Sequence, residues 1–80
     1  MSRTLAAIAR EIRADWKSPY FGAMPYLSAM GGMGDMRDAY GMDSAREVVL
    51  YFLSNATTWR GETARRVKAE LKAMLKGAAR

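Results

Sequence analysis

A helix with a clear beginning is encoded by residues 44–55, SAREVVLYFLSN. Ser44 and Glu47 form the S-x-x-E pattern of a capping box, in which each side chain satisfies a free backbone N–H of the first helical turn. Asp43 adds negative charge at the positive end of the helix dipole. Apolar residues recur at helical spacing and predict one buried face, made of Ala45, Val48, Val49, Phe52, Leu53 and Ala56.

Upstream of this helix, the pattern predicts a helix that begins near Leu5 and a shorter one that ends near Met30. Ser2 or Thr4 can cap the first helix, and Ser18-Pro19 stops it because the residue before proline avoids helical backbone angles. Pro25 suits the first turn of the shorter helix. The first helix has an apolar face of Leu5, Ile8, Ala9, Ile12 and Trp16, and Gly31, Gly32 and Gly34 break the second.

Further helical structure is predicted on both sides of residues 44–55. Residues 35–40 are expected to form one additional turn, closed by Gly41. Downstream, Gly61 precedes a helix from about Glu62 to Lys76, which Gly77 is expected to terminate. Its apolar face is Ala64, Val67, Leu71, Met74 and Leu75.

These elements predict an all-α fold, a compact bundle of about four helices in a single domain spanning residues 1–80, without a sheet. A chain of this length buries a small core, and it has no cysteine or histidine to add a disulfide or a common metal site. Self-association is the remaining way to bury more surface. We therefore expect a homo-oligomer, or a chain that is bound to a partner.

The apolar residues of the middle region are candidates for that oligomer interface. Tyrosine and methionine are enriched at protein interfaces and adapt well to partners. A core that happens to use methionine is the alternative. The predicted interface residues are Tyr20, Phe21, Met24, Tyr26 and Met30.

The positive charge is concentrated at the C-terminal end. From Arg60 onward there are seven basic and two acidic residues, whereas the preceding residues hold six of each sign, so this segment carries the whole net charge of +5. Such a segment favours an anionic partner, and a solvated helix face is the alternative.

Composition also excludes several classes of protein. There is no histidine, the carboxylates are scattered without a paired acid and base, and the hydroxyls have no base to activate them, so we expect no enzymatic activity, no cofactor and no metal site. No apolar run approaches the length of a membrane span, and charged residues interrupt the start of the chain where a signal peptide would be apolar. A cytoplasmic location, without membrane contact, is the expectation.

A candidate ligand site lies at the end of the helix over residues 44–55. Tyr51, Asn55 and Thr58 are spaced to share a face, and Trp59 and Arg60 follow directly. An aromatic ring can stack on a base, an amide can read a base edge, and arginine can clamp a phosphate. A structural role for Trp59 and Asn55 is the alternative. The predicted ligand-binding residues are Tyr51, Asn55, Thr58, Trp59, Arg60, Arg65 and Arg66.

The chain resembles a family of small uncharacterised proteins of tailed phages and prophages. The resemblance covers most of residues 8–75 and is densest over residues 51–62, YFLSNATTWRGE. It also includes Trp16, Tyr20-Phe21-Gly22-Ala23, Pro25-Tyr26 and Ala39-Tyr40-Gly41. It implies no particular mechanism, but it places the chain among accessory proteins that often bind and neutralise a host factor, which would then act in the cytoplasm of the host.

The leading hypothesis from sequence is therefore a counter-defence protein that sequesters a phosphate-bearing nucleotide as an oligomer. The alternatives are an inhibitor that binds a host protein or nucleic acid directly, and a virion assembly protein. DNA binding through a helix-turn-helix is less favoured because the basic residues of the last helix surround it and the two long helices do not match the short pair of that motif.

Overall fold

Helices are the main elements of the protein, as their sequence signals predict. The computed structural model describes residues 3–34, 39–40 and 43–78. The α-helices are α1 (Leu5–Asp15), α2 (Met24–Met30), α3 (Ala45–Ser54) and α4 (Glu62–Ala78), and a short 3₁₀ helix, η1 (Phe21–Ala23), leads into α2.

The beginning of each helix in the N-terminal half is fixed by a local signal. The hydroxyl of Thr4 accepts a hydrogen bond of 3.1 Å from the backbone N–H of Ala7, so Thr4 is the N-cap of α1. Two free N–H groups of the first turn are satisfied from a distance, since Leu5 donates to the carbonyl of Gly34 and Ala6 to that of Met33. Pro25 occupies the first turn of α2, and Gly31 follows its last residue, as predicted.

The third helix begins with the predicted capping box. The backbone N–H of Glu47 donates to the Ser44 hydroxyl at 3.2 Å, and the Glu47 carboxylate accepts from the Ser44 backbone N–H at 3.1 Å. The predicted start of α4 at Glu62 is also confirmed. However, α4 continues through Gly77 to Ala78, so the prediction that Gly77 terminates it is wrong.

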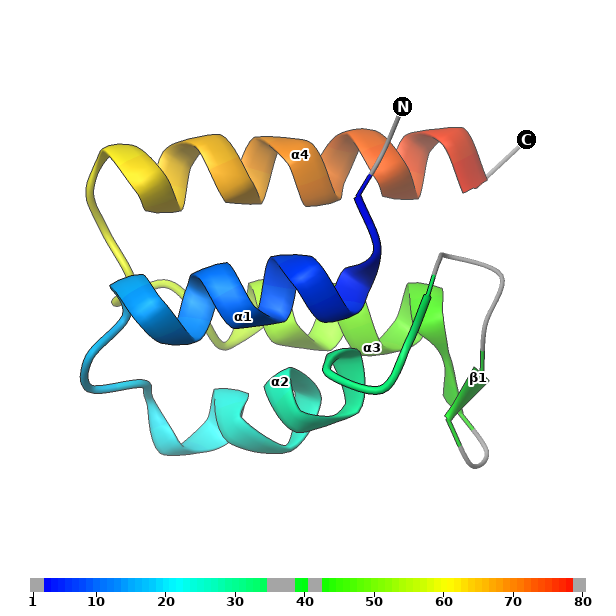
Figure 1. Cartoon of the computed structure of the whole chain (residues 1–80), viewed down its shortest axis with the longest axis horizontal. Coiled ribbons are helices and arrows are strands. Elements are labelled where there is room, and N and C mark those ends of the chain that lie inside the picture. Colours follow the sequence, from blue (N-terminus) through cyan, green and yellow to red (C-terminus); the bar gives the residue numbers. More distant parts are fainter. Residues whose placement is uncertain (1–2, 35–38, 41–42, 79–80) are drawn as a thin grey trace.

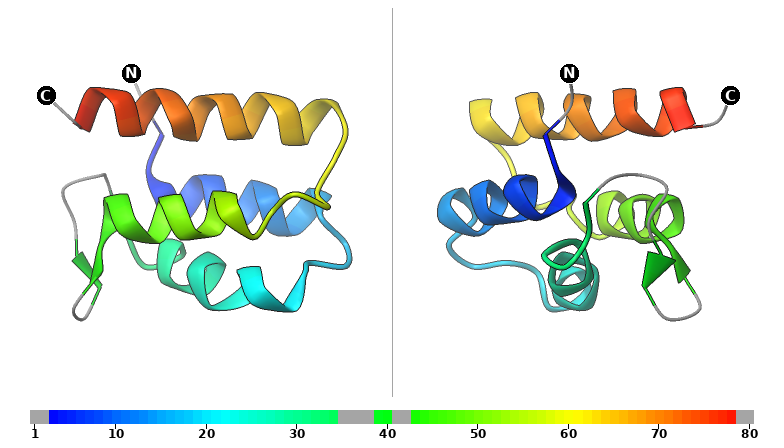
Figure 2. Two further views of the ribbon diagram at one scale, coloured as in Figure 1. Left: turned by 180° about the vertical axis from the view of Figure 1, so that it is seen from behind. Right: turned by 45° about the vertical axis from the view of Figure 1, so that its right-hand side comes forward.

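The four α-helices are arranged in three layers (Figure 1). An oblique view shows α1 and α3 side by side in the middle layer, with α4 on one side and α2 on the other (Figure 2). The whole chain measures 30 × 25 × 19 Å. The predicted compact bundle of four helices is therefore confirmed, whereas the expected absence of any strand pair is not.

The core lies between these layers and is made of the predicted apolar faces. Each α-helix contributes, and the residues of the turn after α3 add a tryptophan at one end. The largest side chains that are essentially inaccessible are Phe52, Leu5, Ile8, Ile12, Leu27, Met30, Leu71, Val48, Val49 and Val67.

One short extended segment differs from the prediction. Strands β1 (Ala39–Tyr40) and β2 (Asp43–Ser44) form an antiparallel pair of two residues each, with Ala39 opposite Ser44. Thus Ala39 and Tyr40 are not part of the helical turn predicted for residues 35–40, while residues 35–38 and 41–42 lie outside the described part of the chain. Ser44 is thus the last residue of β2 and also the N-cap of α3, and it has the extended conformation that is typical of an N-cap.

Candidate functional site

Trp59, predicted to contact a ligand, lies in the core. Its side chain is 2% exposed. Its ring stacks on Trp16, with centroids 5.8 Å apart, and meets Phe52 edge to face. The indole Nε1–H donates a hydrogen bond of 2.8 Å to Asp15 Oδ2 at the end of α1. The structure therefore gives Trp59 the structural role that the sequence left open, and no ligand base can stack on it without displacing the side chains that bury it.

Asn55 and Tyr51 lie on the side of α3 that faces α2. The Asn55 side-chain N–H₂ donates to the Tyr51 carbonyl at 2.8 Å, and its backbone N–H also bonds to carbonyls of the last turn, so Asn55 closes α3. The Tyr51 ring packs against Tyr26 of α2 with centroids 5.5 Å apart. Thr58 is exposed in the following turn.

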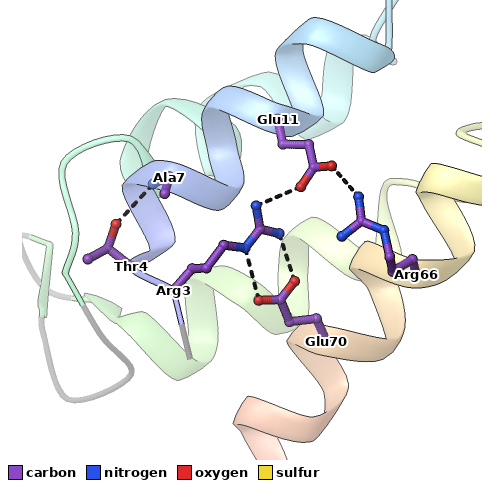
Figure 3. A network of polar contacts seen from close by, with 6 residues as sticks. All are labelled: Arg3, Thr4, Ala7, Glu11, Arg66 and Glu70. Carbon is purple, nitrogen blue, oxygen red and sulfur yellow. Dashed lines mark hydrogen bonds and ion pairs between the residues drawn. The ribbon is translucent and has the colours of Figure 1, made fainter. Parts of the chain in front are cut away.

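Arg66 belongs to a network of charges that joins α4 to α1 (Figure 3). Arg66 pairs with Glu11, which also pairs with Arg3 at 2.7 Å. Arg3 in turn forms a two-pronged contact with Glu70, donating from Nε at 3.1 Å and from Nη2 at 2.7 Å. Two positive and two negative charges therefore balance one another, and Arg66 is engaged within the fold.

The network changes the proton affinity of its members. Hydrogen bonds from Arg3 and then Arg66 lower the pKa of the Glu11 carboxyl below its ordinary value. The hydrogen bond to Glu70 is the main cause that raises the pKa of Arg3 above its ordinary value. The four side chains thus link α1 and the residues just before it to α4 by ion pairs.

Lys68 is a second basic residue of α4 that is engaged within the fold, and the sequence did not reveal this role. Its ammonium donates to the carbonyls of Ala56 and Trp59, both at 2.7 Å, and lies 5.9 Å from the centre of the Trp59 ring. Burial lowers the pKa of Lys68, and the positive charges of Lys72 and Arg60 lower it further. Lys68 therefore differs from Lys72 and Lys76, which follow it at four-residue spacing and are exposed.

Once Arg66 and Lys68 are assigned, the remaining cations of α4 share one face. Arg65, Lys72 and Lys76 are exposed, and none of them has an ion pair within the described residues. Their spacings of seven and four residues place them in one row along the helix. Arg60, which is also exposed, lies in the turn just before α4. We call Arg60, Arg65, Lys72 and Lys76 the α4 stripe.

The predicted ligand-binding residues are thus distributed over different parts of the molecule. Trp59 is in the core, Arg66 faces α1, Tyr51 and Asn55 face α2, and only Arg60 and Arg65 belong to the α4 stripe. Helix α4 and helix α2 lie on opposite sides of the middle layer (Figure 2). The predicted residues therefore do not converge on one ligand pocket.

The predicted interface residues also separate into groups. Met30 is 0% exposed and belongs to the core of the single chain, so its predicted place in an interface is wrong. The cause is that α2 lies against both α1 and α3 and turns Leu27, Ala29 and Met30 inward. Tyr20 and Phe21 are exposed, and Met24 and Tyr26 are half-buried.

Comparisons with known proteins find no matching family model, no matching curated protein and no matching solved structure. In the described part of the chain, no helix combines the length and the apolar character needed to cross a membrane.

Proposed function

We propose that this protein is a non-enzymatic binding protein that holds the phosphate backbone of a nucleic acid along the α4 stripe. The observation that carries the proposal is the row of Arg65, Lys72 and Lys76, which is exposed and has no ion pair in the described structure. Nucleic-acid binding was one of the alternatives that the sequence left open.

The acidic residues of the fold explain which cations remain for a partner. Glu11 and Glu70 neutralise Arg3 and Arg66 on the side of α4 that faces α1. The ammonium of Lys68 donates to two carbonyls of the same chain. Glu11 and Glu70 are thus paired on the side of α4 that faces α1. The α4 stripe has four positive charges against the one exposed carboxylate of Glu62 in the first turn of the helix, and this excess favours a polyanion.

The dimensions of the α4 stripe favour a polymer over a single nucleotide. From Arg65 to Lys76 the helix rises about 16 Å. Each strand of duplex DNA carries a phosphate for about 3.4 Å of axis, so roughly five phosphates span this length. A mononucleotide presents its charge at one point and needs converging contacts, whereas the α4 stripe offers charges in a line.

The location of Trp59 supports the same choice. Sequestration of a nucleotide was predicted from a tryptophan that stacks on the base, and this ring is covered by Trp16. The hypothesis of nucleotide sequestration is thus left without a residue that could stack on the base, whereas the basic C-terminal segment still favours an anionic partner. A phage-type accessory role, in which occupation of a nucleic acid blocks a host process, is the biological context we propose on the basis of the family resemblance.

The test is fluorescence anisotropy with labelled 20-base-pair duplex DNA, at several salt concentrations. Four phosphate contacts predict a slope of log K against log salt of about −3.6. Affinity should then fall by about 10²-fold between 50 and 200 mM salt. Calorimetry with a panel of linear and cyclic nucleotides tests the alternative, which is binding of a single nucleotide.

Paired charge reversals give this test its control. Arg65→Glu/Lys72→Glu alters the α4 stripe, and Arg10→Glu/Lys17→Glu makes the same change in net charge at two exposed residues of α1 and the segment after it. We expect the first variant to bind at least tenfold more weakly than the second and to reduce the slope by about one for each phosphate that it no longer neutralises. Equal binding by the two variants, or tight nucleotide binding with little salt dependence, would refute the proposal.

A further inference from the structure

The side of the molecule opposite α4 exposes aromatic rings. Phe21 is 87% exposed, Tyr20 is 52% exposed and Tyr51 is 46% exposed. Tyr51 packs on the half-buried Tyr26, and Met24 begins the same helix. We call Tyr20, Phe21, Met24, Tyr26 and Tyr51 the α2 face. An almost fully exposed phenylalanine beside other exposed rings is typical of an interaction surface.

The two edges of the α2 face carry opposite charges. On the α1 side, Arg13 is exposed and reaches over to α2, where it donates to the Ser28 hydroxyl at 3.3 Å. On the α3 side, Glu47 is exposed and lies one helical turn before Tyr51. Since α2 lies between α1 and α3 (Figure 2), the apolar band has a cation along one edge and an anion along the other.

This arrangement is complementary to itself. Arg13 lies in the last turn of α1 and Glu47 in the first turn of α3, and the two helices run in the same direction (Figure 1), so the two charges lie at diagonally opposite corners of the α2 face. A two-fold axis that lies in the plane of the α2 face and crosses α2 obliquely exchanges these two corners. Arg13 of one copy then lies opposite Glu47 of the second copy, and the reverse pair forms at the other corner. Two-fold interfaces use the same surface patch on both subunits, and this patch satisfies that condition in both apolar character and charge.

We propose that the α2 face binds the α2 face of a second copy to form a symmetric dimer. The three exposed rings offer roughly 350 Å² per copy, since an aromatic side chain has about 150–250 Å². With Met24, Tyr26 and the charged edges added, the pair of copies reaches the low end of about 1,200 Å² for a specific interface. An interface of this size is typical of a weak dimer that exchanges readily.

The dimer has a consequence for nucleic-acid binding. This consequence, unlike the dimer itself, rests on the proposed function. Helix α4 lies on the far side of each copy from the α2 face, and each copy is about 25 Å thick in that direction (Figure 1). The two α4 stripes of the dimer then face outward, about 50 Å apart. Such a dimer bridges two segments of nucleic acid.

Sedimentation equilibrium without nucleic acid tests the dimer itself. Phe21→Ser removes the most exposed ring and leaves the core intact, while Leu50→Ser is the matched control, because Leu50 is an exposed apolar residue of α3 outside the α2 face. Phe21→Ser should raise the dimer dissociation constant by at least about 30-fold, as for an interface hot spot. The control should leave it within about twofold.

The charge pairing is tested through Arg13 and Glu47. Glutamine also fits the third position of a capping box, so Glu47→Gln removes the charge and keeps the helix cap. Glu47→Gln should weaken the dimer about two- to fivefold in the parent chain and strengthen it in an Arg13→Glu background, where it removes a repulsion. In an Arg10→Glu background its effect should equal that in the parent.

Two results would overturn the proposal. One is a parent chain that remains a monomer of 8.9 kDa at several hundred micromolar concentration. The other is equal behaviour of Phe21→Ser and Leu50→Ser. A monomeric Phe21→Ser variant that still binds DNA but no longer bridges two duplexes would support the dimer and the nucleic-acid proposal together. Loss of DNA binding by the α4 variants, with the dimer unchanged, would support each surface separately.

Discussion

The contact between Trp59 and Asp15 joins the turn after α3 to the end of α1, and removing it should destabilise the fold. Trp59→Phe keeps an aromatic ring beside Trp16 but loses the N–H that donates to Asp15 at 2.8 Å. A hydrogen bond to a charged group contributes about 1.5–3 kcal/mol. We take the lower half of this range because the carboxylate of Asp15 is exposed to water.

The smaller ring adds a second loss. Trp59 is buried among Trp16 and Phe52, and a phenylalanine leaves part of its volume empty. The two effects together amount to about 3 kcal/mol. A domain of this length has a free energy of unfolding of about 4–12 kcal/mol, so the variant should lose a large fraction of it. The midpoint of thermal unfolding should fall by at least about 10 °C.

A double-mutant cycle isolates the hydrogen bond. Asp15→Ala alone removes the acceptor, but it also removes a negative charge from the C-terminal end of a helix, which is worth about 0.3–1 kcal/mol in the opposite direction. The coupling energy between Trp59→Phe and Asp15→Ala in urea unfolding, followed by circular dichroism, should be about 1–2 kcal/mol. A coupling near zero, or a Trp59→Phe variant as stable as the parent, would contradict the structural role assigned to Trp59.

Three further predictions concern the backbone and two half-buried charged residues. Gly61→Ala should lower the free energy of unfolding by about 1–2 kcal/mol because Gly61 has a φ of +115°. Gly32→Ala, at a glycine without a positive φ, should leave it unchanged or raise it by up to about 1 kcal/mol, and urea unfolding compares the two variants. Lys68→Met should destabilise the fold by about 1–3 kcal/mol in the same assay, because two carbonyls lose their donor, and a stabilised variant would show that burial of the charge outweighs its hydrogen bonds. The lowered pKa of Glu11 means that its contribution is present above its ordinary pKa of 4.5 and is lost as the pH falls through the lower value of the folded state. The stability of Glu11→Gln should therefore decline less than that of the parent between about pH 5 and pH 3, and parallel declines would refute this assignment.

The helices could be predicted from the sequence because their signals are local. The capping box of Ser44 and Glu47 and the start of α4 at Glu62 involve neighbouring residues, and both were found where predicted. Gly77 shows the limit of such signals: a glycine in a helix costs only about 1 kcal/mol, so α4 can continue through it.

The candidate site could not be predicted from the sequence because it depends on contacts between distant residues. Arg3 and Glu70 are 67 positions apart, and Trp59 and Asp15 are 44 positions apart. The sequence showed that the last helix is basic, but it did not show that Arg66 is neutralised by Glu11 while Lys68 bonds to carbonyls. Only after these contacts are known do the remaining cations form a single row.

The exposed rings show the same dependence on packing. Phe21 and Met30 are both apolar residues of the middle region, and both were predicted at an interface. The structure places Met30 in the core, because α2 turns that side toward its neighbours, and leaves Phe21 at 87% exposure in η1. Composition favoured an interaction surface in this region, and the arrangement of the helices determines which of its residues are exposed and which are buried.

The most direct measurement of the central claim is an NMR titration of the ¹⁵N-labelled protein with a short DNA duplex. If α4 holds the phosphate backbone, the amide signals of Arg60, Arg65, Lys72 and Lys76 and their neighbours should shift progressively, and added salt should reverse the shifts. The amides of the α2 face should change little. Shifts confined to Tyr51, Asn55 and Thr58, or no shifts at low salt, would contradict the account.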